Sequence, residues 1–343
     1  MRKIAICSLL LAGCFDWDLL SSNPIEPDLP VVTDGPTTED LADAPVGDQA
    51  DLPTADPLKR IFTATGPKKA DQAIFGWGTS NLIAVGSKGG VVTTSNLQNF
   101  TATTVGSGDP DLFDVWLSAD GSSSWIVGKA ASFRWSANSW EKLATGLLGD
   151  LHAVFGSSVM LLAAGTADGL VFEFKSGTNT WQATGGAVFN ATQNGMWGTG
   201  QTFWSVGSQC LYIENGLPSL KSCGLASPTD ALESVWGVDA DTVFAAGREG
   251  TGGVVMRWDA SGKTWQKVNV AIAEKLTAVW VASKTDVWVG GETGALYRYT
   301  GTGSDAKKLT SAALGTENIR DMWGYDASHV FILTDQGNIY TTQ

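Results

Sequence analysis

The sequence is short of the residues that most catalytic and metal sites use. Its 343 residues include four cysteines and two histidines, His152 and His329, and only 17% of them are charged. It contains no His-Glu-x-x-His motif, Cys-x-x-Cys pair, nucleophile elbow, phosphate loop or calcium loop. We therefore expect no metal and no cofactor, and we expect both histidines to lie in loops or at strand ends.

Long apolar runs and an excess of basic charge are also absent. The longest apolar run, residues 4–11, is far shorter than the ~20 residues that span a bilayer. Residues 59–343 hold 20 basic and 24 acidic side chains, a net charge of −4. A nucleic-acid-binding protein needs a basic surface, so this near balance argues against nucleic acid as a partner.

Residues 1–14 have the pattern of a secretory signal, with Arg2 and Lys3 ahead of the apolar run and small residues behind it. The tetrad Leu-Ala-Gly-Cys that ends at Cys14 resembles a bacterial lipobox. The resemblance implies that Cys14 is lipidated and becomes the mature N-terminus, which anchors the protein in the cell envelope. Phe15 follows where an inner-membrane lipoprotein would carry Asp, which favours the outer membrane. The alternative is an ordinary secretory signal with an incidental cysteine.

Residues 15–58 predict a disordered tether. They contain 11 acidic residues, seven of the 11 prolines and no Lys or Arg. Such a segment cannot bury enough apolar surface to offset its ordering entropy. We expect membrane contact through the N-terminal lipid alone.

Glycine and tryptophan, with 41 and 15 residues in the whole chain, are abundant, and nearly all of them lie in residues 59–343 together with many β-branched residues. This mixture favours short strands and tight turns. Seven times, an apolar strand ends in an aromatic residue, here called the anchor of the repeat. A second strand follows each anchor, and it ends in glycine in six repeats and in Thr334 in the seventh. The anchors recur about every 40 residues, at Trp77, Trp116, Phe155, Trp197, Trp236, Trp280 and Trp323.

Each repeat adds a third strand and, in most cases, a fourth. Four strands per ~40 residues predict an all-β protein, a seven-bladed β-propeller over residues 59–343. The last repeat ends after its third strand, and residues 61–65 resemble the fourth strand at residues 100–104. We therefore expect this N-terminal strand to complete the last blade and to close the ring.

The remaining cysteines and the tryptophans fit structural roles. Cys210 and Cys223 flank the hairpin signal Asn215-Gly216, so antiparallel pairing would bring them together as a disulfide. The anchor aromatics are expected to pack between blades rather than to stack on sugars.

Two turns are similar to the Asp-box hairpins of sialidase-like propellers: Asp-Ala-Ser-Gly-Lys-Thr-Trp at 259–265 and Ser-Gly-Thr-Asn-Thr-Trp at 176–181. Over residues 61–343 the repeat resembles bacterial propellers related to the photosystem II assembly factor, including secreted lipoproteins with Asp-Val-Trp motifs such as residues 286–290. These resemblances imply the fold and say little about function.

Propeller topology places the loops before each first strand and those between second and third strands on one face, around the channel. Loops on a rigid scaffold commonly carry recognition groups. The candidate binding face comprises Lys88, Asp114, Lys129, His152, Asp168, Glu233, Arg248, Glu292, Arg320 and Asp335. Its mixed charge favours contact with a protein or a glycan.

The sequence thus predicts a monomeric, non-enzymatic binding or scaffold lipoprotein that holds an envelope protein or a surface polysaccharide. One alternative is a glycan-active enzyme, sialidase-like or lyase-like, with acids drawn from Asp114, Glu233 or Asp321. That alternative requires paired carboxylates about 5–9 Å apart. Another is an assembly factor for a membrane complex, which an arginine-lined patch would favour.

Overall fold

The computed structural model describes residues 55–143, 149–165, 169–185, 190–300 and 306–342. They belong to one compact unit, Thr54–Gln343. The expected signal peptide, Cys14 and nearly all of the expected tether lie outside the described residues. Within the described residues, no helix is long and apolar enough to cross a membrane.

Seven four-stranded antiparallel sheets make up this unit. Blade 1 consists of β2 (Ala73–Trp77), β3 (Asn81–Val85), β4 (Gly90–Thr94) and β5 (Phe100–Thr104). Blade 2 consists of β6 (Leu112–Leu117), β7 (Ser124–Gly128), β8 (Ala131–Ser136) and β9 (Ser139–Lys142). Blade 3 consists of β10 (Leu151–Gly156), β11 (Leu161–Gly165), β12 (Val171–Lys175) and β13 (Thr180–Ala183). Blade 4 consists of β14 (Gln193–Thr199), β15 (Thr202–Gly207), β16 (Cys210–Glu214) and β17 (Leu217–Lys221).

The other three blades continue this order. Blade 5 consists of β18 (Ala231–Asp239), β19 (Thr242–Glu249), β20 (Gly252–Asp259) and β21 (Thr264–Lys267). Blade 6 consists of β22 (Leu276–Ser283), β23 (Asp286–Gly291), β24 (Leu296–Tyr299) and β25 (Ala306–Lys308). Blade 7 consists of β26 (Ile319–Asp326), β27 (His329–Thr334), β28 (Ile339–Thr342) and β1 (Leu58–Phe62). Two short 3-10 turns, η1 (Ser87–Gly89) and η2 (Glu292–Gly294), link second to third strands.

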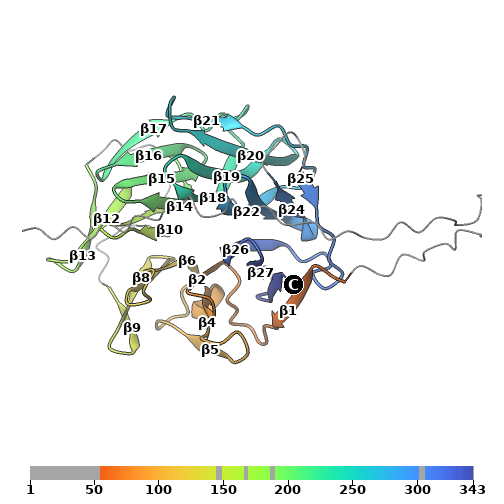
Figure 1. Cartoon of the computed structure of the whole chain (residues 1–343). Helices are drawn as coiled ribbons and strands as arrows, with labels where there is room; N and C mark the ends of the chain where they lie inside the picture. Colours follow the sequence, from red (N-terminus) through yellow and green to blue (C-terminus); the bar gives the residue numbers. More distant parts are fainter. Residues whose placement is uncertain (1–54, 144–148, 166–168, 186–189, 301–305, 343) are drawn as a thin grey trace, which may run out of the picture. The chain divides into compact units, whose positions relative to one another are not determined.

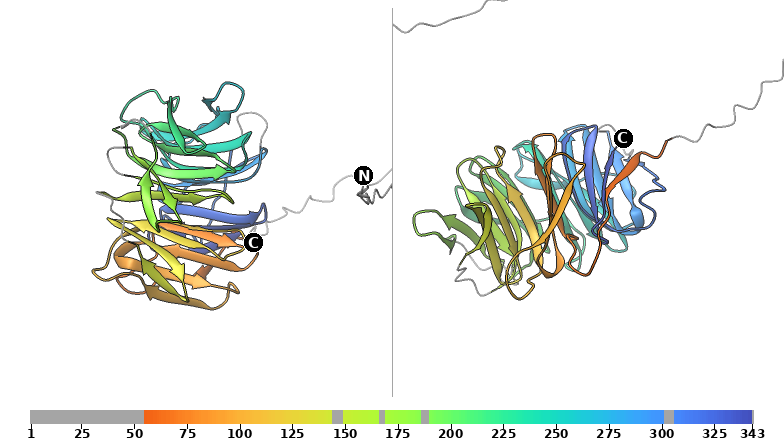
Figure 2. Two further views of the ribbon diagram at one scale, coloured as in Figure 1. Left: turned by 90° about the vertical axis from the view of Figure 1, so that its left-hand side faces the viewer. Right: turned by 90° about the horizontal axis from the view of Figure 1, so that it is seen from below.

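The first strands of neighbouring blades contact one another all the way round, including β26 against β2, so the blades form a closed ring (Figure 1). The seven-bladed propeller expected from the repeats is confirmed. Figure 2 shows the blades side by side, with the C-terminal strand next to β1.

The N-terminal strand completes blade 7, as expected, but it begins earlier than the sequence suggested. β1 pairs with β28, with Leu58 opposite Thr342 and Phe62 opposite Ile339, whereas residues 61–65 were the expected strand. Leu58, expected at the end of the tether, is buried in the blade. Asp56 holds the start of this strand, because its carboxylate accepts the backbone N–H groups of Leu58 at 2.9 Å and Ala313 at 2.8 Å.

Blade packing explains why glycine follows most of the anchors. The indole of Trp197 lies where a side chain on Gly237 of the next blade would be, 2.8 Å from an added Cβ, and Trp280 does the same at Gly324. Trp323 packs in this way on Gly76. Together with Trp116, whose indole packs on Gly156, these anchors lie between two blades at positions where the next blade has no Cβ.

The assignment of Trp77 as the anchor of blade 1 is wrong, because Phe75 occupies the anchor position between the blades. Phe75 precedes the glycine that receives Trp323, and its ring lies 5.7 Å from Trp236 and 6.3 Å from Trp323. Two residues further on, the side chain of Trp77 lies outside this inner ring of aromatics and lines a different hollow.

The disulfide between Cys210 and Cys223 is confirmed, with 5.2 Å between the two Cα atoms. Glu214 pairs with Leu217, which leaves Asn215 and Gly216 as the two turn residues. Both have positive φ, 52° and 77°, as the tight two-residue hairpin turn requires.

Candidate functional site

A β-bulge opens the first strand in six of the seven blades. Each bulge leaves one residue without a partner on the second strand and turns its side chain toward the mouth of the central channel. The bulged residues are Phe113, His152, Asn194, Glu233, Thr277 and Arg320. In blade 1 the strand begins without a bulge, and Gln72 lies at the matching place.

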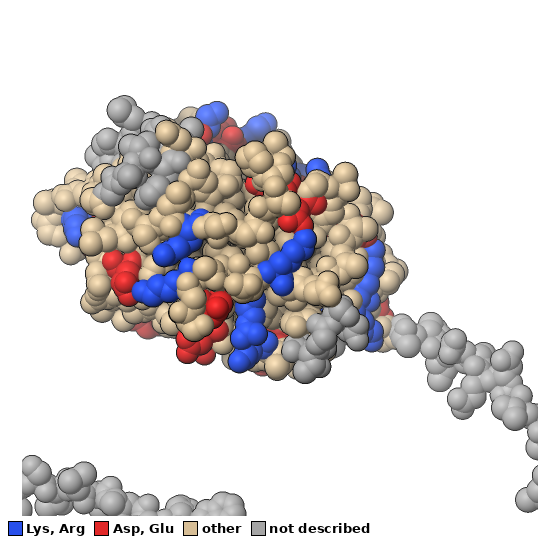
Figure 3. Space-filling model, turned by 90° about the horizontal axis from the view of Figure 1, so that it is seen from above, with Lys and Arg blue, Asp and Glu red and all other residues tan. Residues whose placement is uncertain are grey.

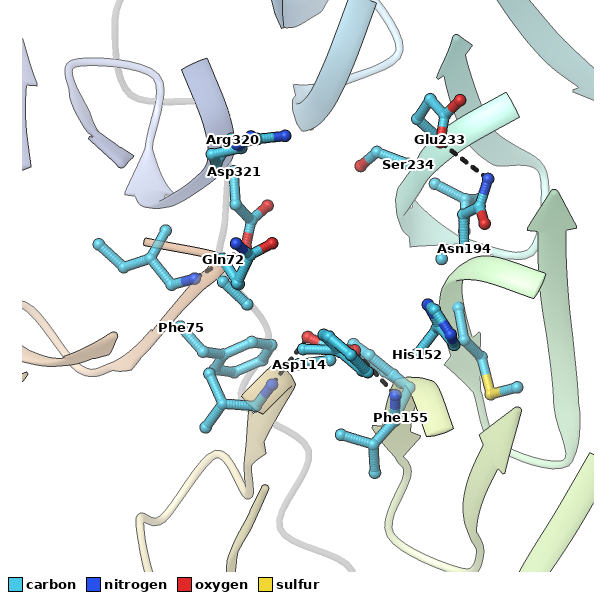
Figure 4. Close-up of a pocket in the computed structure, with 18 of the residues that line it drawn as sticks. Gln72, Phe75, Asp114, His152, Phe155, Asn194, Glu233, Ser234, Arg320 and Asp321 are labelled. Atoms are coloured by element: carbon cyan, nitrogen blue, oxygen red, sulfur yellow. Dashed lines mark hydrogen bonds between the residues drawn. The ribbon is translucent and has the colours of Figure 1, made fainter. Parts of the chain in front are cut away.

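All seven of these side chains line one cavity (Figure 4). Its volume is about 100 Å³, below the ~300–1,000 Å³ typical of small-molecule sites. The cavity therefore has room for a few water molecules or for one inserted side chain, and not for a whole drug-sized ligand. Phe75 and Phe155 lie deeper in it.

Two carboxylates lie one residue beyond the bulges, in blades 2 and 7. Asp114 accepts the backbone N–H of Val154 in blade 3 at 2.8 Å, and Asp321 accepts that of Ile74 in blade 1 at 2.8 Å. The second oxygen of each carboxylate accepts the N–H of the next residue in its own strand, also at 2.8 Å. Both carboxylates therefore join neighbouring blades across the channel wall.

Burial raises the pKa of both carboxyl groups. It raises the pKa of Asp321 to about 7, against the opposing effect of its two backbone hydrogen bonds. The pKa of Asp114 is raised well above its usual value, first by burial and further by the charge of Asp321. Near neutral pH this pair carries less negative charge than two exposed carboxylates would.

The other ionisable side chains at the mouth differ in whether a hydrogen bond or ion pair holds them. Glu233 accepts hydrogen bonds from Asn194 Nδ2 at 2.8 Å and Arg248 Nε at 3.3 Å, which balances its charge. His152 stacks on Phe113 with 4.7 Å between ring centroids, and burial lowers its pKa, so it is neutral at pH 7. Arg320 is exposed, and its side chain has no hydrogen bond or ion pair with any described residue. Among the described residues that line the mouth, Arg320 is therefore the cation that has no acidic partner.

The structure brings together only part of the expected binding face. Asp114, His152, Glu233 and Arg320 line the cavity, and Arg248 reaches it through Glu233. The other described members, Lys88, Lys129, Glu292 and Asp335, lie further out, in the turns between second and third strands. Asp168 lies outside the described residues.

Among the seven side chains that converge on the mouth, Gln72, Phe113 and Thr277 were missed. The bulges could have been detected, because they interrupt the alternation of buried side chains: Leu112 and Val115 are both buried, with two half-buried residues between them. In an uninterrupted strand, positions three apart point to opposite faces. Among the described residues, no three His, Cys, Asp or Glu side chains gather as metal ligands.

No family model matches the chain, and no curated protein matches it either. Solved structures do match. The structure titled "YCF48 bound to D1 peptide" is 15% identical, covers 84% of this chain and 97% of its own, and has a TM-score of 0.65. Virginiamycin B lyase from Staphylococcus aureus is 10% identical, covers 83% and 99%, and has a TM-score of 0.71. The WD40 propeller domain of Doa1 is 13% identical, covers 84% and 97%, and has a TM-score of 0.66.

At these identities the likeness establishes the fold alone. The similar structures include a protein solved with a bound peptide and a lyase, so the fold by itself does not assign an activity. The chain is a seven-bladed β-propeller similar in architecture to these proteins.

Proposed function

We propose that this protein is an envelope-anchored binding lipoprotein that holds a protein partner at the mouth of its channel, without catalysis. The observation that carries the proposal is the convergence of seven side chains, from seven blades, on a cavity sized for one inserted side chain. The guanidinium of Arg320, which lines this cavity and bonds no described residue, favours an acidic side chain of the partner. A propeller with the same architecture has been solved with a bound peptide.

A glycan-active enzyme is the second candidate, and one observation favours it. Asp114 and Asp321 share the cavity, and their raised pKa values are of the kind found in catalytic acids. Both carboxylates, however, already accept two backbone N–H groups, one from the neighbouring blade and one from their own strand. We assign them to the framework of the ring for that reason.

The third interpretation, an assembly factor, is a narrower form of the binding function. It calls for an arginine-lined patch, whereas the cavity mouth holds Arg320 and, through Glu233, Arg248. On the face seen in Figure 3, basic and acidic side chains are interspersed. A surface polysaccharide remains the other partner class that the proposal must be tested against.

Affinity capture of the full-length, lipidated protein from its own host, followed by mass spectrometry, tests the proposal. We expect an envelope protein to be enriched with the unaltered chain and lost with Arg320→Glu, which reverses the free charge. Lys307→Glu is the matched control, because Lys307 is an exposed cation on the outer strand β25. Equal capture by both variants would contradict the assignment of the mouth, and turnover of oligosaccharides that Asp321→Asn abolishes would establish the enzyme instead.

The anchor is tested separately. Cys14→Ser should release the protein from membranes, because the lipid would be its only membrane contact. Fractionation of host cells measures this, and membrane association that survives the substitution would contradict lipidation at Cys14.

A further inference from the structure

A second hollow, away from the channel, lies between blades 1 and 2, which are drawn in orange and yellow in Figure 1. Its volume is about 440 Å³, within the ~300–1,000 Å³ range of small-molecule sites. Three tryptophans line it: Trp77, Trp135 and Trp140. Trp77 and Trp140 are partly buried and pack against the core of blades 1 and 2, whereas Trp135 is exposed.

Trp77 is free to line this hollow because Phe75 occupies the anchor position of blade 1. Its indole lies against Gly121, in the turn between β6 and β7, where an added Cβ would come within 2.4 Å of Nε1. The positive φ of Gly121, 70°, and this close approach both require glycine there. The indole of Trp77 thus packs on the turn at Gly121 and also forms part of the wall of the hollow.

Trp135 and Trp140 face each other across the hairpin of β8 and β9. Their ring centroids are 5.2 Å apart, with the planes at 67°. Trp135 remains 39% exposed, whereas Trp204, a core tryptophan, is 1% exposed. An exposed indole beside an open hollow indicates a surface that takes part in binding.

The polar groups of the hollow are uncharged and available. The hydroxyls of Thr93 and Thr101 and the amide of Asn99 line it, and none of these side chains has a hydrogen bond to any described residue. No Asp, Glu, Lys, Arg or His is among the residues that line it. Such a wall disfavours phosphates, nucleotides, acidic sugars and charged peptides, which need a compensating charge.

We propose that this hollow, here named the tryptophan groove, binds a neutral oligosaccharide chain. Flat indole faces cover the apolar C–H faces of sugar rings, while amides and hydroxyls exchange hydrogen bonds with sugar hydroxyls. A further hollow of about 770 Å³ at the other end of the channel shares Trp77 and Leu117 with the groove. A ligand can therefore continue past Trp77, which favours a chain of several sugar units over a monosaccharide.

The test is isothermal titration of the full-length protein with cellohexaose, xylohexaose and maltohexaose, and with polygalacturonate as a charged probe. We expect at least one neutral hexasaccharide to bind, with an affinity unchanged between 0.05 and 0.5 M NaCl, because no charge pairing contributes. Trp135→Ala should weaken binding about tenfold or more, and Trp135→Tyr should restore part of it. Asn99→Ala should weaken binding severalfold.

Leu217→Ala is the matched control, because Leu217 is another exposed apolar residue, 61% exposed, on blade 4. It should leave saccharide binding unchanged. Thermal unfolding of each variant separates loss of binding from loss of fold. Absence of binding to all three neutral probes, equal binding by Trp135→Ala, or preference for polygalacturonate would overturn the proposal. Binding of an apolar peptide in place of the saccharides would also overturn it. None of these results bears on the channel mouth, so the two proposals fail independently.

Discussion

The second and the fourth strands of each blade differ in what surrounds them. Second strands such as β7 and β15 are buried along nearly their whole length, whereas fourth strands such as β5 and β9 are mostly exposed. The second strand packs against neighbouring blades on both faces, while the fourth is the outer edge. The sequence repeat that identifies the fold therefore lies in the inner strands, where packing constrains every residue.

The outer strands carry what distinguishes one blade from another. The disulfide ties down the segment after β17 in blade 4, Trp140 of the tryptophan groove lies on β9, and the strand that closes the ring, β1, is the outer strand of blade 7. An exposed edge tolerates such additions because few packing contacts depend on it. Inner strands thus determine the architecture, and outer strands accommodate individual features.

The largest expected effect comes from a matched pair of tryptophans. Trp204→Ala on β15 should lower the free energy of unfolding by about 3–5 kcal/mol, because it leaves a large cavity in the core. Trp135→Ala, on the outer hairpin of blade 2, should cost less than about 1 kcal/mol, because this residue is already 39% exposed and its removal leaves no enclosed cavity. Urea unfolding followed by circular dichroism measures both. Similar losses in the two variants would break the contrast between inner and outer strands.

The disulfide should give the next largest effect, although it lies at the outer edge. Cys210 and Cys223 close a loop with a sequence separation of 13, and a loop of this size contributes about 2–4 kcal/mol. The double variant Cys210→Ala and Cys223→Ala should lose that amount in urea unfolding. Reductant should destabilise the unaltered protein similarly and leave the variant unchanged. A further loss on reducing the variant would show that reductant acts elsewhere.

Much of the fold could be predicted from the sequence because the inner strands repeat. The number of blades, the closing strand and the disulfide all follow from spacing and from turn residues. The anchor of blade 1 could not be assigned so simply, because Phe75 and Trp77 are both aromatic and only pairing with β3 distinguishes them. Likewise, β1 starts at Leu58 because Asp56 bonds a residue more than 250 positions away, a contact that no local pattern records.

The candidate site was predicted less completely than the fold. Charged residues such as Glu233 and Arg320 were found because their strand starts were located correctly. Phe113 and Thr277 occupy the same bulge position in their strands but were missed, because neither carries a charge that would single it out in the sequence. The tryptophan groove was missed for a different reason: regular spacing assigned Trp77 to the core, and its displacement by two residues is visible only in the strand register.

Asp321 is a carboxyl group among the buried inner strands, and its effect on stability should appear only as a change with pH. Its folded pKa of about 7 lies above the ordinary value of 3.8, so between about pH 4 and 7 the folded protein binds more protons than the unfolded chain. The contribution of this group to stability is fully present below about pH 4 and is lost as the pH rises through 7. Asp114, which faces the same cavity, acts in the same direction.

Asp321→Asn keeps an oxygen for the N–H of Ile74 and removes the titration. The variant should exceed the unaltered protein in stability at pH 8, by on the order of a few kcal/mol at about 1.4 kcal/mol per pKa unit, and lose this advantage at pH 4, where both side chains are neutral. Asp120→Asn is the control, because the pKa of this exposed carboxyl is lowered to about 2 by hydrogen bonds from its own turn, so its contribution runs in the opposite direction. Urea unfolding at several pH values distinguishes the two. The opposite result would be a variant whose stability, relative to the unaltered protein, is lower at pH 8 than at pH 4. The ionised carboxylate would then itself hold blade 7 to blade 1, and their contact would depend on its charge.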